Sequence, residues 1–433
     1  MPGEESSMTV HLPTTPRVTS SAGMPHPDRL RSLSRVRELL VEQPDQVLDE
    51  LTKFTTIGAA RYELAAAIAT LDGALAECQR HRPAAVRNIA VFMPSNVLLY
   101  SYVLYLLVPS LFADRVVLRP ASQTAEHLQR LHAMLAPVHG LPIEPLMVSQ
   151  RAFVWDAVLP ADVVVFTGAY QNAEQIRPQL RAEQLLLFLG AGVNPFIVAP
   201  GADLAAAARD AVQIRMFNTG QDCLAPDLFC VQESDADAFL DLLLKEVKGL
   251  RYGEYADPTA DYGSIFYHGA LEAAALFLFK NRANIVHGGS IDFRSRRVEP
   301  AVVVSPLDGR SGDTEFFAPV FNVAVYPDEA TATRILTSGI YAERALGASV
   351  YGDAPALTAA LARRHTVTIN ASMFSVDDGN APFGGWGPMA SYAAYSGRLH
   401  VGPILVSQAV ARHLGQAGEP VEPDVGETGM GAR

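Results

Sequence analysis

Short apolar segments alternate with helical patterns between residues 88 and 166, and this alternation constrains the fold more than any other feature of the chain. Apolar residues three and four positions apart indicate helices, whereas short apolar runs bounded by polar residues indicate strands. We predict strands at 88–93, 115–118 and 163–166, and helices at 98–112 and 124–135. This order implies a parallel sheet that binds ligands at the carboxyl ends of its strands.

A second alternation follows a strand predicted at 185–189 and the glycine-containing turn behind it. Its predicted strands are 196–198, 228–231, 301–304, 323–326 and 367–370, with helices at 202–215 and 236–247. Two successive alternations predict an α/β protein with two domains, and a binding site in the cleft between them. Helical spacing also runs through residues 29–85, so helices precede the first sheet.

Cys223 is the strongest candidate for a nucleophile. It follows a turn at residues 218–220, where Asn and Gly tolerate the left-handed backbone that ends a helix. We expect the thiol to contact backbone N–H groups that favour its reactive thiolate form. The other two cysteines, Cys78 and Cys230, lie in a helical and a strand-like pattern and are predicted to be core residues. Three cysteines without CxxC spacing argue against a disulfide framework and a zinc site.

Composition excludes several classes of protein. The 46 acidic residues outnumber the 34 basic ones, and no basic cluster occurs, which argues against nucleic acid as a partner. The most apolar run, 97–113, is short for a bilayer span and is predicted to be a buried helix. The Pro-, Ser- and Thr-rich residues 1–28 lack the apolar segment of a secretory signal, so we predict a cytoplasmic protein. Residues 1–28 and 415–433 are predicted to be disordered tails.

Six short motifs follow one another along the chain. They are Met93-Pro94-Ser95-Asn96, Val116-Val117-Leu118-Arg119-Pro120, Val164-Val165-Phe166-Thr167-Gly168, Asn218-Thr219-Gly220-Gln221-Asp222-Cys223, Glu315-Phe316-Phe317-Ala318-Pro319-Val320, and Ile369-Asn370 with Pro382-Phe383-Gly384-Gly385. Each alone is a weak signal, but their shared order over roughly residues 88–400 resembles the aldehyde dehydrogenase superfamily. The resemblance implies an aldehyde dehydrogenase-like fold with a Rossmann-type cofactor domain, a catalytic domain and a small oligomerisation element.

The resemblance also implies roles for individual residues. Cys223 would attack a carbonyl carbon, and the Asn96 amide with the Cys223 backbone N–H would hold the resulting oxyanion. Without the other motifs, Asn96 would be interpreted as a turn residue. The residues implied to contact the cofactor are Pro94, Arg119, Ser122, Thr167, Gly168, Glu315 and Phe317.

Phe188 marks the most consequential departure from the family pattern. Hydrolytic members carry a Glu at this position, which activates water, and a phenyl ring cannot accept a proton. Residues 190–195 resemble the Gly-rich, Asn-Pro segment of CoA-acylating members, which lack that Glu. We therefore favour reduction of an acyl thioester, carried by CoA or a carrier protein, to an aldehyde. The alternatives are a hydrolytic aldehyde dehydrogenase with a relocated base, and a catalytically silent binding subunit.

The cofactor segment departs from the family pattern as well. Ser122 falls where NAD-preferring members often carry a Glu, and a carboxylate there would repel a 2′-phosphate. Ser122 beside Arg119 would tolerate that phosphate, so the pattern favours NADP(H) over NAD(H). The histidines are scattered without metal-ligand spacing, and no metal is expected.

The resemblance completes the domain assignment. Helices and the dinucleotide-binding domain are predicted over 29–189, and the catalytic domain over 190–395. Residues 396–414 are predicted to hold the oligomerisation strand, read at 400–406, although Pro403 suits only an edge or a bulge. A homodimer or homotetramer is therefore expected.

Overall fold

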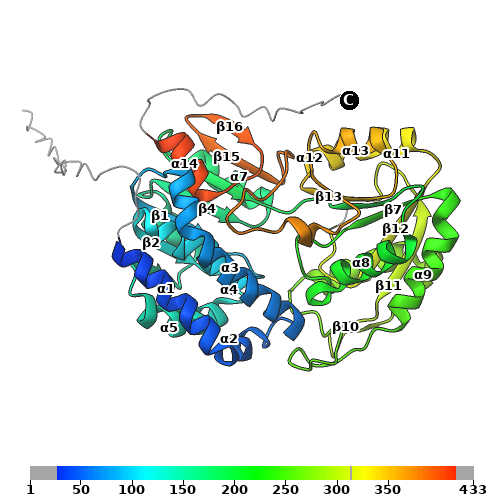
Figure 1. The fold of residues 1–433 in the computed structure, drawn as a ribbon, viewed down its shortest axis with the longest axis horizontal. Helices are drawn as coiled ribbons and strands as arrows, with labels where there is room; N and C mark the ends of the chain where they lie inside the picture. The colour runs from blue at the N-terminus through cyan, green and yellow to red at the C-terminus, as the bar shows by residue number, and fades with distance from the viewer. Residues whose placement is uncertain (1–26, 313–314, 416–433) are drawn as a thin grey trace, which may run out of the picture.

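The structure, a computed structural model, describes residues 27–312 and 315–415, so the predicted tails lie almost wholly outside it. Two seven-stranded sheets lie beside one another, each covered by helices (Figure 1). Both consist mainly of parallel strands. The predicted α/β architecture is thus confirmed, with two sheets of mainly parallel strands.

The first sheet has the strand order β16-β15-β5-β4-β1-β2-β3. Its strand β5 is a continuous apolar run in which every residue is buried, as expected for a strand covered on both faces. The bounds are β1 Val86–Phe92, β2 Ala113–Arg119, β3 Ile143–Pro145, β4 Val163–Thr167, β5 Leu185–Leu189, β15 Ser391–Tyr395 and β16 Arg398–Val401.

Helices cover this sheet unequally. One face carries a large apolar core built with α1 Pro27–Glu42, α2 Pro44–Leu51, α3 Ile57–His81, α4 Leu98–Tyr102, α5 Ala125–His139 and α14 Val406–Leu414. The other face packs against α6 Gln150–Phe153 and α7 Tyr170–Ile176. The predicted buried helix at 97–113 is α4 continued by a π-helical turn at Val103–Leu107 and a 3₁₀ turn at Pro109–Leu111.

The second sheet has the order β14-β13-β6-β7-β12-β11-β8. Its strands are β6 Pro195–Val198, β7 Leu228–Gln232, β8 Ile285–His287, β11 Ala301–Pro306, β12 Val320–Tyr326, β13 Gly347–Tyr351 and β14 Thr366–Ile369. One face packs on α8 Leu204–Met216 and α9 Ala236–Lys248, and the other on α11 Glu329–Leu336, α12 Gly339–Glu343 and α13 Pro355–Leu361. Beside it lie α10 Ala270–Lys280 and the hairpin of β9 Ile291–Asp292 and β10 Arg297–Val298.

The chain returns to the first sheet at its end, which the predicted domain boundaries did not anticipate. Strand β15 pairs antiparallel with β5, and β16 pairs antiparallel with β15. Residues 391–395 therefore lie in the first sheet, although they were assigned to the catalytic domain. The strand read at 400–406 is also wrong beyond Val401, because α14 begins at Val406. Pro403 lies between these two elements and could not donate to a strand ladder.

Strand order places a natural binding edge in the first sheet. The chain runs from β1 to β2 and β3 on one side, then returns to β4 and β5 on the other. Adjacent strands β1 and β4 therefore form a switch point, where the two following loops diverge and leave room for a ligand. Within the described part of the chain, no helix is both long and apolar enough to cross a bilayer.

Candidate active site

The backbone before Cys223 is held in an unusual conformation. Asn218, Thr219 and Gly220 have φ values of +46°, +62° and +78°, so three consecutive residues occupy the left-handed region after α8. A β-branched residue such as Thr219 rarely adopts this conformation, and strain of this kind persists only where surrounding contacts impose it.

Hydrogen bonds between the loop's own side chains and backbone N–H groups of distant segments impose that conformation. The Asn218 Oδ1 atom accepts from the Thr56 N–H at 3.2 Å, and the Thr219 hydroxyl accepts from the Gly263 N–H at 2.9 Å. The Gln221 side chain donates to the Asn218 carbonyl and accepts from the Phe266 N–H at 2.8 Å. These contacts hold the Cys223 loop from both domains.

Asn194 fixes the position of Cys223 itself. Its Nδ2 donates to the Cys223 carbonyl at 2.6 Å, and its Oδ1 accepts from the Gly347 N–H at 3.1 Å. Asn194 belongs to the Gly-rich, Asn-Pro segment noted in the sequence. The segment therefore supports the nucleophile loop, a role that its spacing alone did not reveal.

Cys223 opens onto a cavity of about 110 Å³ between the two domains. Most of its wall is apolar or aromatic, and none of the described residues that line it is Lys, Arg or His. The polar wall consists mainly of the carboxyl groups of Glu63, Asp222, Asp377 and Asp378 and the hydroxyls of Tyr62 and Tyr100. The remaining lining includes Val97, Leu104, Tyr105, Leu189, Phe217, Leu224, Phe374, Phe383, Ile404 and Leu405.

The expectation of a favoured thiolate at Cys223 is wrong, because the surroundings of the thiol raise its pKa. Burial raises the pKa of the Cys223 thiol well above its usual value of 9.0, and the charges of Asp222, Glu315 and Asp377 raise it further. A backbone N–H contact lowers the pKa but does not offset these effects. The thiol therefore needs a proton acceptor or a change in its surroundings before it can attack.

Three carboxyl groups of low exposure surround the cavity: Glu63 and Asp222 are buried, and Asp377 is half-buried. Burial raises the pKa of Glu63 to about 7 and that of Asp222 to about 6. Burial also raises the pKa of Asp377, although the Tyr62 and Tyr100 hydroxyls donate to its carboxylate at 2.8 and 3.3 Å. Carboxyl groups whose pKa is raised beside a nucleophile are candidates for proton transfer.

The raised pKa of Glu63 predicts a pH-dependent stability. The folded protein holds a proton on Glu63 between pH 4.5 and about 7, whereas the unfolded chain releases it. The free energy of unfolding therefore falls as pH rises through this window. We expect Glu63→Gln to match wild type near pH 4.5 and to be more stable by about 1–3 kcal/mol at pH 8.

Urea unfolding from pH 4.5 to 8 tests this expectation. The exposed Glu126, changed to Gln, is a suitable control, since its side chain is 73% exposed. A constant difference between Glu63→Gln and wild type across the pH range would contradict the raised pKa.

The residues implied to contact a cofactor gather at the binding edge of the first sheet. Pro94 lies in the loop after β1, and Arg119 is the last residue of β2. Thr167 is the last residue of β4, and Gly168 follows it. Because these strands are parallel and adjacent, their carboxyl ends meet at the switch point. Ser122 is exposed and lies in the loop that follows β2.

Not all of these side chains are free to bind. The Thr167 hydroxyl donates to the Phe92 carbonyl at 2.7 Å, which ties β4 to β1. The Arg119 guanidinium donates to the Val148 carbonyl at 3.0 Å and to the Pro120 carbonyl at 3.4 Å, which leaves other N–H groups available. Gly168 has a φ of +145°, which only glycine adopts readily.

Glu315 and Phe317 line a second hollow of about 230 Å³, together with Ser95 from the loop after β1. Arg344 Nη2 lies 3.3 Å from Glu315 Oε2. Burial and the neighbouring Asp227 raise the pKa of Glu315 to about 7 in spite of this pairing. The hollow thus joins a residue from the first sheet's binding edge to residues that precede β12.

Asn96 is buried at the end of the same loop, and its Nδ2 has no hydrogen-bond partner among the described residues. The next residue, Val97, has a φ of +46° and lines the Cys223 cavity. An unpaired buried donor is costly, and strain in a β-branched residue is also costly. Both features are typical of a residue placed to meet a ligand.

Phe188 lies in the core and not on the cavity wall. It is fully buried, and its ring centroid is 4.9 Å from that of Tyr392 and 5.9 Å from that of Tyr170. A Cβ added at Gly190 would lie 2.3 Å from Phe188 Cζ, so the ring occupies the space above that glycine. The side chain at 188 is therefore structural in this protein.

Several site residues escaped the sequence analysis. Glu63, Asp377, Arg215, Asp227 and Arg344 lie far apart in the chain and belong to no short motif. Of these residues, Arg215 alone gave a signal in the sequence, because an arginine near the end of an apolar, alanine-rich helix is unusual. Cys78 and Cys230 are buried as predicted. No cluster of three potential metal ligands occurs within residues 27–312 and 315–415.

Fold and site together define a class: two α/β domains that enclose a cysteine cavity facing the ligand edge of a Rossmann-type sheet. The sequence matches the aldehyde dehydrogenase family over residues 18–391, so the chain belongs to that family. Among solved structures, succinic semialdehyde dehydrogenase from Streptococcus pyogenes with NADP⁺ has a TM-score of 0.76 at 18% identity, covering 88% of this chain and 90% of that chain.

Two curated relatives are similar in sequence. The chain is 30% identical over 299 residues to 4,4'-diapolycopene-4,4'-dial dehydrogenase of Cytobacillus firmus, covering 66% of this chain and 63% of that protein. It is 30% identical over 287 residues to a putative NADP⁺ succinate-semialdehyde dehydrogenase of Mycolicibacterium smegmatis, covering 63% and 54%. The matched regions thus span less than two thirds of both relatives.

Proposed function

We propose that this protein is an NAD(P)-dependent aldehyde oxidoreductase that carries the acyl group on Cys223. The observation that supports this most directly is the geometry of the Cys223 loop. Three left-handed residues, held where Asn218 and Thr219 accept from backbone N–H groups of both domains, present the thiol to a cavity between these domains. Strain that surrounding contacts maintain at a nucleophile is easier to explain by chemistry than by stability.

The chain's own residues account for the covalent steps. The Cys223 sulfur attacks the carbonyl carbon, the S–C bond forms, and the carbonyl π electrons move to oxygen. The unpartnered Asn96 Nδ2 and the Cys223 backbone N–H would stabilise that oxyanion. A carboxyl group of the cavity wall, Asp222 or Asp377, would accept the thiol proton.

The binding edge of the first sheet suits a nicotinamide dinucleotide. Pro94, Arg119 and Gly168 meet at its switch point, and Glu315 offers a carboxylate in the adjoining hollow. The bound cofactor would accept or supply the hydride at the substrate carbon. The S. pyogenes neighbour binds NADP⁺, and a 1-pyrroline-5-carboxylate dehydrogenase from Thermus, at a TM-score of 0.74, binds NAD. The absence of a carboxylate at Ser122 favours NADP(H).

We infer that the group which takes the acyl group from Cys223 is a thiol. Phe188 is buried among aromatic rings, so no base stands at that position to activate water. In the reductive direction, Cys223 thiolate displaces the carrier thiol from an acyl thioester: the new S–C bond forms as the carrier's breaks. The carrier thiolate takes up a proton as it leaves. Hydride addition to the Cys223 thioester gives a thiohemiacetal oxyanion, which collapses to the aldehyde and the Cys223 thiolate.

Water is the second candidate acceptor, for a specific reason. The cavity wall carries Glu63, Asp222 and Asp377, any of which could serve as a relocated base. The curated relatives are named as dehydrogenases, which favours aldehyde oxidation. Because the described lining contains carboxyl groups and no basic side chain, it disfavours carboxylate-bearing substrates in either case.

Product analysis separates the two acceptors. Purified protein would be supplied with NADP⁺ or NAD⁺ and aldehydes of equal length with and without a terminal carboxylate, each with and without CoA. The reverse assay would follow NADPH and NADH oxidation with acyl-CoA thioesters. We expect thioester formation and consumption that require CoA, with uncharged chains preferred.

Each other outcome has a defined meaning. Free acid formed at the same rate without CoA would establish water as the acceptor and would contradict a thiol as the acceptor. Silence in both directions, with CoA and with a carrier-protein pantetheine thioester, would favour the catalytically silent alternative. A homodimer or homotetramer remains a prediction, which the mass of the protein in solution would test.

A further inference from the structure

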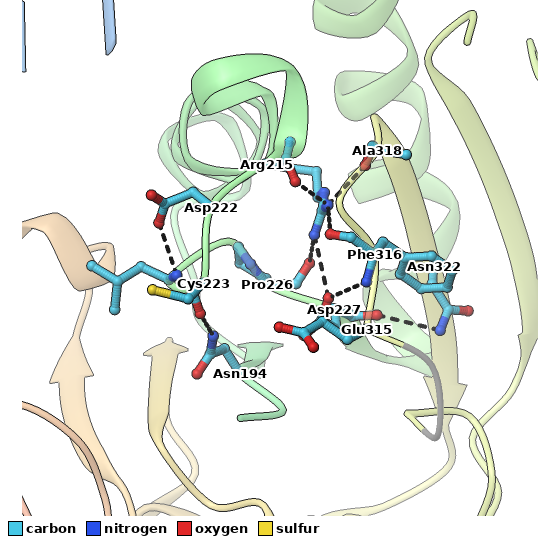
Figure 2. A network of polar contacts seen from close by, with 12 residues as sticks. Asn194, Arg215, Asp222, Cys223, Pro226, Asp227, Glu315, Phe316, Ala318 and Asn322 are labelled. Carbon is cyan, nitrogen blue, oxygen red and sulfur yellow. Dashed lines mark hydrogen bonds and ion pairs between the residues drawn. The ribbon is translucent and has the colours of Figure 1, made fainter. Parts of the chain in front are cut away.

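Arg215 is a fully buried arginine in the last turn of α8, and its guanidinium joins two loops of the proposed site (Figure 2). Its Nη1 donates to the Pro226 carbonyl at 2.9 Å. Its Nη2 donates to the Gly220 carbonyl at 2.8 Å and to the Ala318 carbonyl at 2.7 Å, and also to the Phe316 carbonyl. One side chain therefore binds the Cys223 loop and the segment that holds Glu315 and Phe317.

Asp227 completes the connection. Its Oδ1 lies 3.5 Å from Arg215 Nη1 and accepts from the Phe316 N–H at 2.9 Å. Asp227 immediately precedes β7, and Phe316 lies four residues before β12, the strand that pairs with β7. The same ion pair thus contacts both segments at the amino ends of neighbouring strands.

The two loops also touch directly, without room for adjustment. A Cβ at Gly220 would lie 2.5 Å from the Ala318 oxygen and 3.0 Å from Arg215 Nη2. Gly220 has a φ of +78°, so both its conformation and its surroundings exclude a side chain. Figure 2 shows the Cys223 sulfur pointing away from Arg215, so the guanidinium does not touch the reacting atom.

Stability alone is a weak explanation for this arrangement. Desolvation lowers the pKa of Arg215, opposed chiefly by the charge of Asp227. A buried ion pair of this kind often stabilises a fold no better than apolar side chains of similar volume would. The planar guanidinium of Arg215, however, can bind several carbonyl groups in one fixed geometry, which neither an apolar side chain nor a lysine can do.

We propose that Arg215, with Asp227, is a positioning pair that sets the placement of the Cys223 loop relative to the cofactor-facing segment 315–317. The inference rests on the proposed function, since it takes Cys223 as nucleophile and Glu315 as a cofactor contact. Its consequence is that occupation of the hollow beside Glu315 alters the reactivity of the Cys223 thiol through Arg215.

Two variants test the proposal. Arg215→Lys keeps the positive charge but loses the planar guanidinium that binds several carbonyl groups. Asp227→Asn keeps the size of the side chain but loses its negative charge. The measurements are kcat and KM for the preferred substrate, and the rate of Cys223 alkylation by iodoacetamide with and without saturating NADP⁺, located by mass spectrometry. We expect kcat to fall on the order of 100-fold in Arg215→Lys, and less in Asp227→Asn, with KM nearly unchanged.

The alkylation ratio is the measurement that a merely structural role would leave unchanged. In wild type we expect NADP⁺ to change the alkylation rate by about 5-fold or more, and in Arg215→Lys the ratio should approach one. Tyr351→Phe is the matched control, since it removes a buried hydroxyl that donates to Asp210 in the same domain. That control should keep both kcat and the ratio.

The proposal would be overturned if NADP⁺ did not change the alkylation rate of Cys223 in wild type. It would also be overturned if both variants kept the wild-type kcat and the wild-type ratio of alkylation rates with and without NADP⁺. A lower melting temperature with kcat and that ratio unchanged would show a merely structural role and would overturn it too. If Arg215→Lys does not fold, Asp227→Asn decides by the same criteria. Failure of the proposed function is recognised separately, because Cys223→Ala would then remain active whatever Arg215 does.

Discussion

Replacing Cys223 by alanine is expected to lower turnover by about 10⁴-fold or more, because no other described group could form the covalent adduct from this position. The folded structure should persist, since the side chain is small and only partly buried. Turnover would be measured in the direction that the product analysis identifies. Mass spectrometry of wild type, quenched during turnover, should find the acyl group on the peptide that carries residue 223.

Cys230→Ala is the matched control for this prediction. Cys230 lies in β7 of the same domain, is fully buried and faces a core of apolar side chains. Burial raises the pKa of its thiol far above the usual value, so it is inert. The control should keep its activity. Activity of Cys223→Ala within tenfold of wild type would refute covalent catalysis at this residue.

Replacing Phe188 by alanine is expected to lower the free energy of unfolding by about 3–5 kcal/mol, the usual cost of removing a buried aromatic ring. The ring packs between Tyr170 and Tyr392, and Tyr392 is its direct cross-strand partner on β15. The loss should therefore also weaken the attachment of β15 to β5. Chemical unfolding measures the free energy, and amide hydrogen exchange in β15 reports the local effect.

Phe188→Leu and Phe188→Glu sharpen the test. Leucine retains most of the apolar contact and should cost less than alanine. Glutamate would place a carboxyl group among aromatic rings, so it should destabilise the protein strongly and give no gain in acid formation. A stable Phe188→Glu variant that produces free acid faster would show that the side chain at 188 reaches the thioester and that our structural interpretation is wrong.

Local sequence patterns determined much of this protein. The strand at Leu185–Leu189 was predicted at its observed bounds, because an apolar run between polar turns has few other ways to bury itself. The same reasoning located most strands of both sheets within a few residues. The order of the motifs identified the family, the loop that carries Cys223 and the strand ends that carry Arg119 and Gly168.

Tertiary structure decided what those residues do. The sequence could not show that the chain returns to the first sheet at β15, because that strand pairs with residues about two hundred positions earlier. It also could not show that Glu63 and Asp377 converge on Cys223, or that Arg215 binds both loops. The pKa of the Cys223 thiol is raised, although the sequence predicted that it would be lowered. Desolvation and the charges of distant carboxylates cause this, and both exist only once the chain has folded.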